Sequence, residues 1–186
     1  MVLMKHLLVW LLLLFLIFSG TRIAQAQNPS NITPSPVPTI EYTLPYPGIL
    51  PTHPLYFLKE SRDKILIFFT REPMEKSQLY LLFADKNLVM GQMLWEQDNK
   101  KSLSILTQGE NYLLNSILAI EKEKKIKEID SGRVDKIEIS VAKHEEILRE
   151  LLSSATREEQ INSLNSNLKI TYQAKQNISA LKENIK

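Results

Sequence analysis

Cysteine is absent from this chain of 186 residues. Its absence excludes a disulfide, a thiolate nucleophile, a zinc site with cysteine ligands and an acylated-cysteine anchor. Glycine is scarce, and the five glycines form neither a phosphate-binding loop nor a dinucleotide fingerprint. We therefore predict no catalytic residue, no bound metal and no cofactor, and an enzyme is the least supported class of protein.

An excess of charge of either sign is also missing once the first residues are set aside. Removing Lys5 and Arg22 from the 23 basic residues leaves 21, which equals the number of acidic residues. A neutral chain lacks the attraction that dominates nonspecific binding to nucleic acid. We expect no nucleic-acid partner.

The first 26 residues have the order of a secretory signal peptide. Lys5 precedes an unbroken apolar run over residues 7–18, and residues 24–26 read Ala-Gln-Ala, a small-x-small cleavage site. The alternative is a retained membrane anchor, with which Arg22 is compatible. The run spans roughly 18 Å, whereas a bilayer core is about 30 Å thick, which favours cleavage after Ala26. We expect export to the periplasm, the cell surface or the medium, with membrane contact only through an uncleaved leader.

Proline divides the remaining chain, because all nine prolines lie between Pro29 and Pro73. Residues 27–43 combine proline with Ser, Thr and Asn, cannot bury an apolar face, and are predicted to form a disordered linker. Residues 44–54 interleave four prolines with apolar side chains, so we expect this segment to lie against the core. The sequence thus predicts one helical domain over residues 44–186.

Apolar residues recur at three- and four-residue spacings through this domain. The spacing predicts an all-α bundle of about five helices, with long antiparallel helices and a proline-rich extended N-terminal segment. The predicted helices cover approximately residues 55–69, 73–97, 102–130, 134–155 and 156 onwards. Ten of the 11 aromatic residues after the leader precede Leu113, so we expect an aromatic-rich core around the first helices.

The last two predicted helices have the clearest register. Their apolar residues form the seam that is typical of coiled-coil packing, and Thr156 and Glu159 match a capping box at the start of the last helix. We expect these two helices to pair as an antiparallel hairpin.

The start of the domain resembles a known family. Residues 47–63 read PGILPTHPLYFLKESRD, which is similar to the PG-x-LP-x-HPLY-x-LK-x-x-RD motif of a bacterial family of exported proteins of unknown function. The next helix matches through residues 69–70 and 84–86, and Lys143-His144-Glu145 resembles a later motif. The resemblance implies an exported helical domain and assigns no activity.

Two histidines follow the leader, His53 and His144. His144 lies on an otherwise aliphatic seam. One interpretation is that it binds a metal ion or senses pH; the other is that it is a partly buried histidine whose hydrogen bonds are made with a neighbouring helix. A site that joins His53 and His144 through a carboxylate is a further alternative. Neither histidine belongs to a spacing such as H-E-x-x-H, so ligands for a catalytic zinc ion are missing.

Four charged residues lie within the family-like region: Arg62, Asp63, Asp85 and Lys86. They either hold a polar ligand or tie two helices together, since buried charge pairs chiefly specify an arrangement. The leading hypothesis is a secreted or envelope-associated, non-enzymatic helical protein that acts as an interaction or structural module. Its partner would be a protein or a component of the cell envelope. The alternative is a periplasmic ligand or metal sensor, or a holdase-type chaperone.

Overall fold

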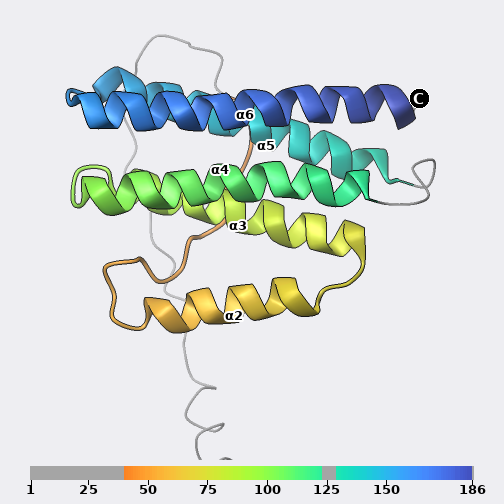
Figure 1. Cartoon of the computed structure of the whole chain (residues 1–186), viewed down its shortest axis with the longest axis horizontal. Helices are drawn as coiled ribbons and strands as arrows, with labels where there is room; N and C mark the ends of the chain where they lie inside the picture. The colour runs from red at the N-terminus through yellow and green to blue at the C-terminus, as the bar shows by residue number, and fades with distance from the viewer. Residues whose placement is uncertain (1–39, 123–128, 186) are drawn as a thin grey trace, which may run out of the picture. The chain divides into compact units, whose positions relative to one another are not determined.

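Five helices make up most of the described chain, which comprises residues 40–122 and 129–185 of a computed structural model (Figure 1). The fold class is therefore all-α, as the apolar spacing predicts. The signal peptide predicted over residues 1–26 and residues 27–39 of the predicted linker lie outside the described residues. The helices are α2 (Tyr56–Phe69), α3 (Pro73–Leu94), α4 (Asn99–Glu121), α5 (Ser131–Ser154) and α6 (Glu158–Ile185).

Acidic side chains cap the starts of α3 and α4. The Glu72 carboxylate accepts the N–H groups of Met74 and Glu75 at 3.1 and 2.5 Å, ahead of a first helical turn that contains Pro73. Asp98 accepts the N–H of Lys101 at 3.0 Å. Because Asp98 is a cap rather than the middle of a loop, α4 begins three residues earlier than the sequence predicts.

A glutamine, rather than the predicted capping box, closes the turn before α6. The Gln160 side-chain oxygen accepts the N–H groups of Thr156 and Arg157 at 3.2 and 3.0 Å. Glu159 therefore does not have the capping role that its spacing from Thr156 predicts. The Gln160 amide also donates to Asn99 at the start of α4, which ties the two helix starts together.

Two antiparallel hairpins pack against each other to form a bundle (Figure 1). One consists of α3 and α4, and the other of α5 and α6, which confirms the predicted pairing of the last two helices. Between the hairpins, α4 packs on α6 and α3 on α5, while α2 lies against α3 at the edge of the bundle. None of the helices in the described ranges has the length and apolar character needed to cross a membrane.

Two glycines let α3 and α4 approach closely. A Cβ atom on Gly91 would lie 2.4 Å from Cγ of the fully buried Leu106, and one on Gly109 would lie 3.3 Å from the backbone oxygen of Ala84. At the same contact, the Ser102 hydroxyl donates to the Gly91 carbonyl at 2.7 Å. A side chain at either glycine would push the helices apart.

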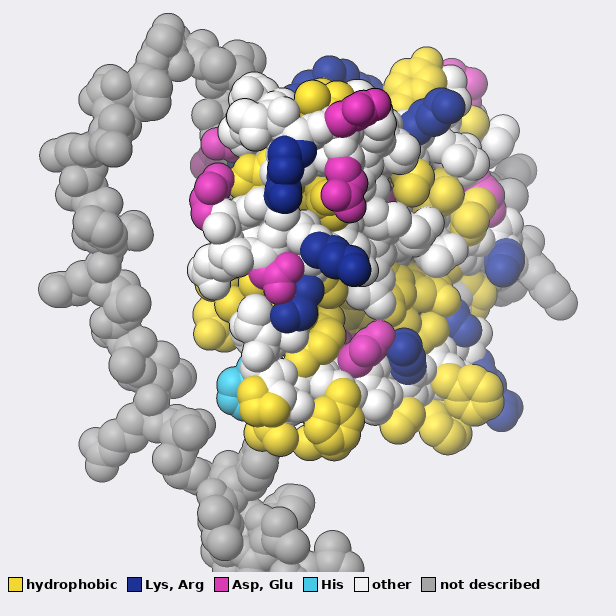
Figure 2. Space-filling model, turned by 60° about the vertical axis from the view of Figure 1, so that its left-hand side comes forward, with side chains coloured by type: hydrophobic (Ala, Val, Ile, Leu, Met, Phe, Trp, Pro, Cys, Tyr) yellow, Lys and Arg dark blue, Asp and Glu magenta, His cyan; other side chains and the backbone are white. Residues whose placement is uncertain are grey.

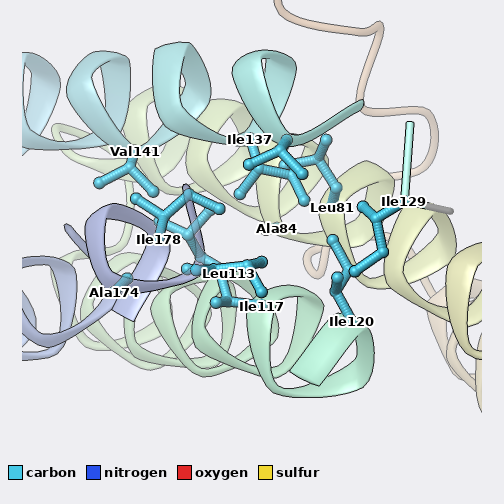
Figure 3. Packing of buried hydrophobic residues seen from close by; sticks show 12 residues of the cluster. Leu81, Ala84, Leu113, Ile117, Ile120, Ile129, Ile137, Val141, Ala174 and Ile178 are labelled. Atoms are coloured by element: carbon cyan, nitrogen blue, oxygen red, sulfur yellow. The ribbon is translucent and has the colours of Figure 1, made fainter. Parts of the chain in front are cut away.

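The core consists of two aliphatic clusters. The first joins all four bundle helices and is shown in Figure 3, where Leu113, Val141 and Ile178 converge from α4, α5 and α6. The second contains Leu88, Leu106, Leu148 and Leu164, with Trp95 at its end. Burial of these side chains is the main force that holds the hairpins together.

The expected aromatic-rich core is wrong. Among the described aromatic residues only Phe83 and Trp95 are buried, whereas Tyr46, Phe68 and Phe69 are strongly exposed. The physical reason is the orientation of α2, which turns its apolar side away from the bundle.

The folded domain also begins earlier than residue 44. The backbone N–H of Ile40 donates to Glu146 at 3.0 Å, and the Tyr42 hydroxyl donates to Asp85 at 2.6 Å. Residues 40–43 are thus part of the domain rather than linker, because Tyr42 supplies a hydroxyl to a buried carboxylate. As expected, the segment that follows lies on the bundle, with Leu44 packed against the second cluster.

Candidate functional site

Asp85 is a buried carboxylate in the middle of α3. Only 3% of the residue is exposed, and three side chains surround its oxygens. The Tyr42 and Ser140 hydroxyls donate to it at 2.6 and 2.7 Å, and Nε2 of His144 lies 3.3 Å away. Burial, with Asp85 beside it, raises the pKa of Tyr42 above its ordinary value, so the hydroxyl keeps its proton and acts as a donor.

His144 joins Asp85 to a second buried carboxylate, Glu110 of α4. The His144 ring is completely buried, and its Nδ1 lies 2.7 Å from Oε1 of Glu110. The other Glu110 oxygen accepts the Thr171 hydroxyl of α6 at 2.6 Å. We call this group the polar layer; its members are Tyr42, Asp85, Glu110, Ser140, His144 and Thr171.

The two carboxylates hold the His144 ring in its protonated form. Burial alone would lower the pKa of His144, because a charged ring loses its hydration. The charge of Glu110 and the hydrogen bonds to Asp85 and Glu110 outweigh burial and raise the pKa to about 9. At neutral pH the ring is an imidazolium that donates from both nitrogens. It has no lone pair with which to accept a proton or bind a metal ion.

The polar layer lies between the two aliphatic clusters. On α3, Asp85 falls between Ala84 of the first cluster and Leu88 of the second; on α4, Glu110 falls between Leu113 and Leu106. His144 and Thr171 occupy the same position on α5 and α6. A charged layer at one level of a bundle fixes the register of its helices, since any slip would leave a buried charge without its partner.

A pocket of about 770 Å³ opens beside the polar layer, between residues 42–45, α3 and α5. This volume is within the range of roughly 300–1,000 Å³ that small-molecule sites have. Tyr42 and Asp85 border the pocket, and Arg133 and Lys136 line its α5 side. Ser77 also lines it, and the Ser77 hydroxyl is buried without a hydrogen-bond partner in the described part of the chain. Such a hydroxyl is suited to a ligand that offers a polar atom.

A third feature is the inverted orientation of α2. Its inward side is polar: Asp63 is 7% exposed, and the Lys59 ammonium lies 3.7 Å from the Asp63 carboxylate and 3.8 Å from the Met90 sulfur. Its outward side is apolar, and Figure 2 shows hydrophobic side chains gathered along the lower edge of the molecule, where α2 lies. We call this side the outward face of α2; it consists of Phe57, Leu58, Ile65, Leu66, Phe68 and Phe69.

No protein-family model matches the chain, and no curated protein or solved structure matches it significantly. The function therefore has to be inferred from the polar layer, the pocket and the outward face of α2.

The structure brings together two of the six residues singled out from the sequence, Asp85 and His144. Elsewhere, Arg62 is bound to its neighbour Asp63, with its Nη2 2.6 Å from the carboxylate, on α2. Lys86 is half-buried on α3, and its charge acts with burial to lower the pKa of Lys59.

His53 and His144 have no interaction partner in common. Its ring is exposed, and Nδ1 accepts the N–H of Leu55 at 3.1 Å, in the turn before α2. Both nitrogens of His144 are already bound to carboxylates, so the two histidines do not share a site. In the described ranges, no three Cys, His, Asp or Glu side chains are placed to hold a metal ion.

Sequence reasoning missed the other four members of the polar layer, Tyr42, Glu110, Ser140 and Thr171. The signal for Glu110 was present, because it lies four residues after Leu106 and three before Leu113, on the buried side of α4. An acidic residue in that position predicts a buried partner. Tyr42 gave no comparable signal, since it lies among linker-like residues.

Proposed function

We propose that this chain is an exported, envelope-associated helical protein without catalytic activity, which binds a partner through the outward face of α2. The observation that supports this proposal most directly is that α2 turns its apolar side away from the bundle. Soluble monomers rarely expose apolar patches larger than a few hundred Å², and larger ones mark interaction sites. The leader and the family resemblance of residues 47–63 support export.

The polar layer supports a non-enzymatic protein. A catalytic acid or base needs a group that can exchange its proton with a bound substrate. His144 is completely buried, and its two nitrogens are committed to Asp85 and Glu110. The buried charges of the polar layer therefore serve to hold the four helices in register.

Site-specific labelling in cells tests the proposal. The chain has no cysteine, so Ser61→Cys places one thiol on the outward side of α2, and Ser166→Cys places a matched thiol on the exposed side of α6. We expect a maleimide that cannot cross membranes, added outside the cytoplasmic membrane, to label the α6 position readily and the α2 position slowly. After purification both positions should react at similar rates.

Equal labelling in cells would show that nothing covers α2, and the proposal would be wrong. Labelling of neither position until the cytoplasmic membrane is opened would show that the chain is not exported. Circular dichroism of both variants confirms that each keeps its helices.

The pocket beside Asp85 supports a second candidate function, a sensor of a small molecule. We expect native mass spectrometry of protein purified without denaturation to detect one bound molecule per chain. Ser77→Leu, which fills the pocket, and Leu82→Glu, which changes its lining, should both lose it. Met93→Glu, on an exposed part of α3 outside the pocket, is the control. A wild-type protein that carries no ligand would exclude this function.

A further inference from the structure

The outward face of α2 is large for a surface patch. Phe68, Phe69 and Phe57 are 78%, 72% and 60% exposed, which amounts to roughly 400 Å² for the three residues at about 200 Å² each. Leu58, Ile65 and Leu66 add to this area. The patch exceeds what single exposed apolar residues produce, so an occupant must cover it in the working protein.

Basic side chains border the patch on both sides. With 3.6 residues per turn, Lys64 lies next to Phe57 on one side, and Arg62 lies next to Phe69 on the other. Their side chains are 63% and 61% exposed. Both basic side chains are paired within the helix, Lys64 with Glu60 at 2.8 Å and Arg62 with the inward-facing Asp63 at 2.6 Å, but exposed pairs of this kind are weak and leave the cations open to other anions. Three basic residues against two acidic ones give α2 a formal charge of about +1, and exposed basic groups lie beside its apolar outward side.

We propose that the outward face of α2 binds the surface of a lipid bilayer that contains anionic lipids, with the helix lying parallel to the membrane. This inference rests on the proposed function and names the component of the envelope that α2 binds. Phe and Leu side chains enter the boundary between headgroups and acyl chains, while Arg62 and Lys64 contact phosphates. A helix with aromatic and aliphatic residues on one side and basic residues beside them has the composition of an interfacial helix.

The shape of the patch favours lipid over a protein partner. A protein interface needs a complementary surface, with pockets that receive the anchoring side chains. The outward face of α2 is the convex side of a single helix, and the pocket next to α2 lies on its inner side, lined by Tyr56 and Glu60 together with residues of α4. Acyl chains are fluid and adapt to a convex surface.

A second copy of the chain fits less well than lipid. In a symmetric dimer the same patch lies on both sides of the interface. In such an interface the excess positive charge of α2 would face the same excess on the other copy. Anionic headgroups instead neutralise both borders at once.

Fluorescence of a labelled thiol tests the inference on the full chain. Ser61→Cys carries an environment-sensitive fluorophore, and Ser166→Cys is the matched control. The probes are vesicles of phosphatidylcholine alone and of phosphatidylcholine with phosphatidylglycerol, each also prepared with a quencher on the acyl chains. We expect the label on α2 to shift to the blue and to be quenched from within the bilayer, more strongly with phosphatidylglycerol, while the label on α6 stays unchanged. Both labelled variants carry the same N-terminal residues, so a difference between the two labels is a difference between α2 and α6.

Adding Phe68→Glu and Phe69→Glu to the labelled α2 variant should weaken vesicle binding at least about tenfold, because two large apolar side chains no longer leave water. Tyr172→Glu, at an aromatic residue of α6 that is 62% exposed, should leave binding unchanged. An α2 label that vesicles of both compositions leave unchanged would overturn the inference. So would a shift that grows with protein concentration in the absence of vesicles, which would identify a second copy as the occupant.

The labelling in cells separates this inference from the proposed function. If α2 is protected in cells but does not bind vesicles, the lipid inference is wrong and the proposed function stands. If α2 is unprotected in cells as well, both are wrong.

Discussion

Replacing His144 by leucine is expected to lower the free energy of unfolding by about 3–5 kcal/mol at pH 7, the range for breaking a buried ion pair by removing one partner. The substitution removes the only cation of the polar layer and leaves the carboxylates of Asp85 and Glu110 buried without it. Urea unfolding followed by circular dichroism measures the change. His53→Leu, at the exposed histidine, should change the free energy by less than about 1 kcal/mol.

A second substitution separates loss of charge pairing from loss of packing. Adding Glu110→Gln to His144→Leu should recover part of the lost stability, because a buried amide costs less than a buried unpaired carboxylate. In a chain that retains His144, Glu110→Gln should instead be destabilising. If His144→Leu costs no more than His53→Leu, or if Glu110→Gln makes it worse, the polar layer does not stabilise the fold in the way its geometry indicates.

The bundle was predictable because periodicity determines which side of a helix is buried. Ile137, Val141, His144 and Leu148 recur at four- and three-residue spacings, and the structure buries all four. The same spacing predicts the hairpin of α5 and α6. The sequence also placed His144 on the buried side, which limits its partners to residues on the buried sides of other helices.

The partners of His144 were not predictable. The spacing of apolar residues shows which side of a helix is buried, but it does not show which residues of other helices pack against that side. Glu110 and Asp85 come from different helices, and their meeting at His144 depends on the axial shift between the hairpins. The level of Asp85 relative to Glu110 depends in turn on the close contact of α3 and α4 at Gly91 and Gly109. Loop lengths and apolar patterns do not determine it.

The orientation of α2 was not predictable either, for a different reason. Its pattern is amphipathic, and an apolar side is normally taken to face the core. Here the core is already closed by the four bundle helices, and the side of α2 turned toward α3 is the polar one, with Asp63 buried and Lys59 next to Met90. A pattern of apolar residues shows that a side is covered, but the same pattern arises whether the cover is the protein's own core or an external partner.

The stability of the chain should also depend on pH through His144. In the folded chain its pKa is raised to about 9, whereas an unfolded histidine titrates near 6.5. Between these values the folded state binds one proton more than the unfolded state, so the free energy of unfolding falls as pH rises. The stabilisation is complete below about pH 6.5 and is lost as pH passes through about 9. A shift of this size at a completely buried ring corresponds to about 3 kcal/mol.

The other groups near the ring do not produce the same slope. Tyr42, Asp85, Glu110, Ser140 and Thr171 face His144 from the N-terminal segment and all four bundle helices. Among them, the Tyr42 hydroxyl has a raised pKa and keeps its proton throughout the interval. Burial lowers the pKa of Lys59, so loss of its proton at high pH favours the folded state and opposes the slope.

Urea unfolding at several values between pH 6 and 9.5 measures this dependence for the wild type and for a variant in which His144→Leu, Glu110→Gln and Asp85→Asn remove the ring and both buried carboxylates, because His144→Leu alone would leave two buried carboxylates that take up protons themselves. The wild type should lose stability across the interval, and the variant should show a flat or slightly rising curve, because only the Lys59 effect remains. Equal slopes in the two proteins would contradict the assignment. Because the pKa of the ring is raised to about 9, the polar layer stays charged at neutral pH, and His144 acts there as a fixed cation.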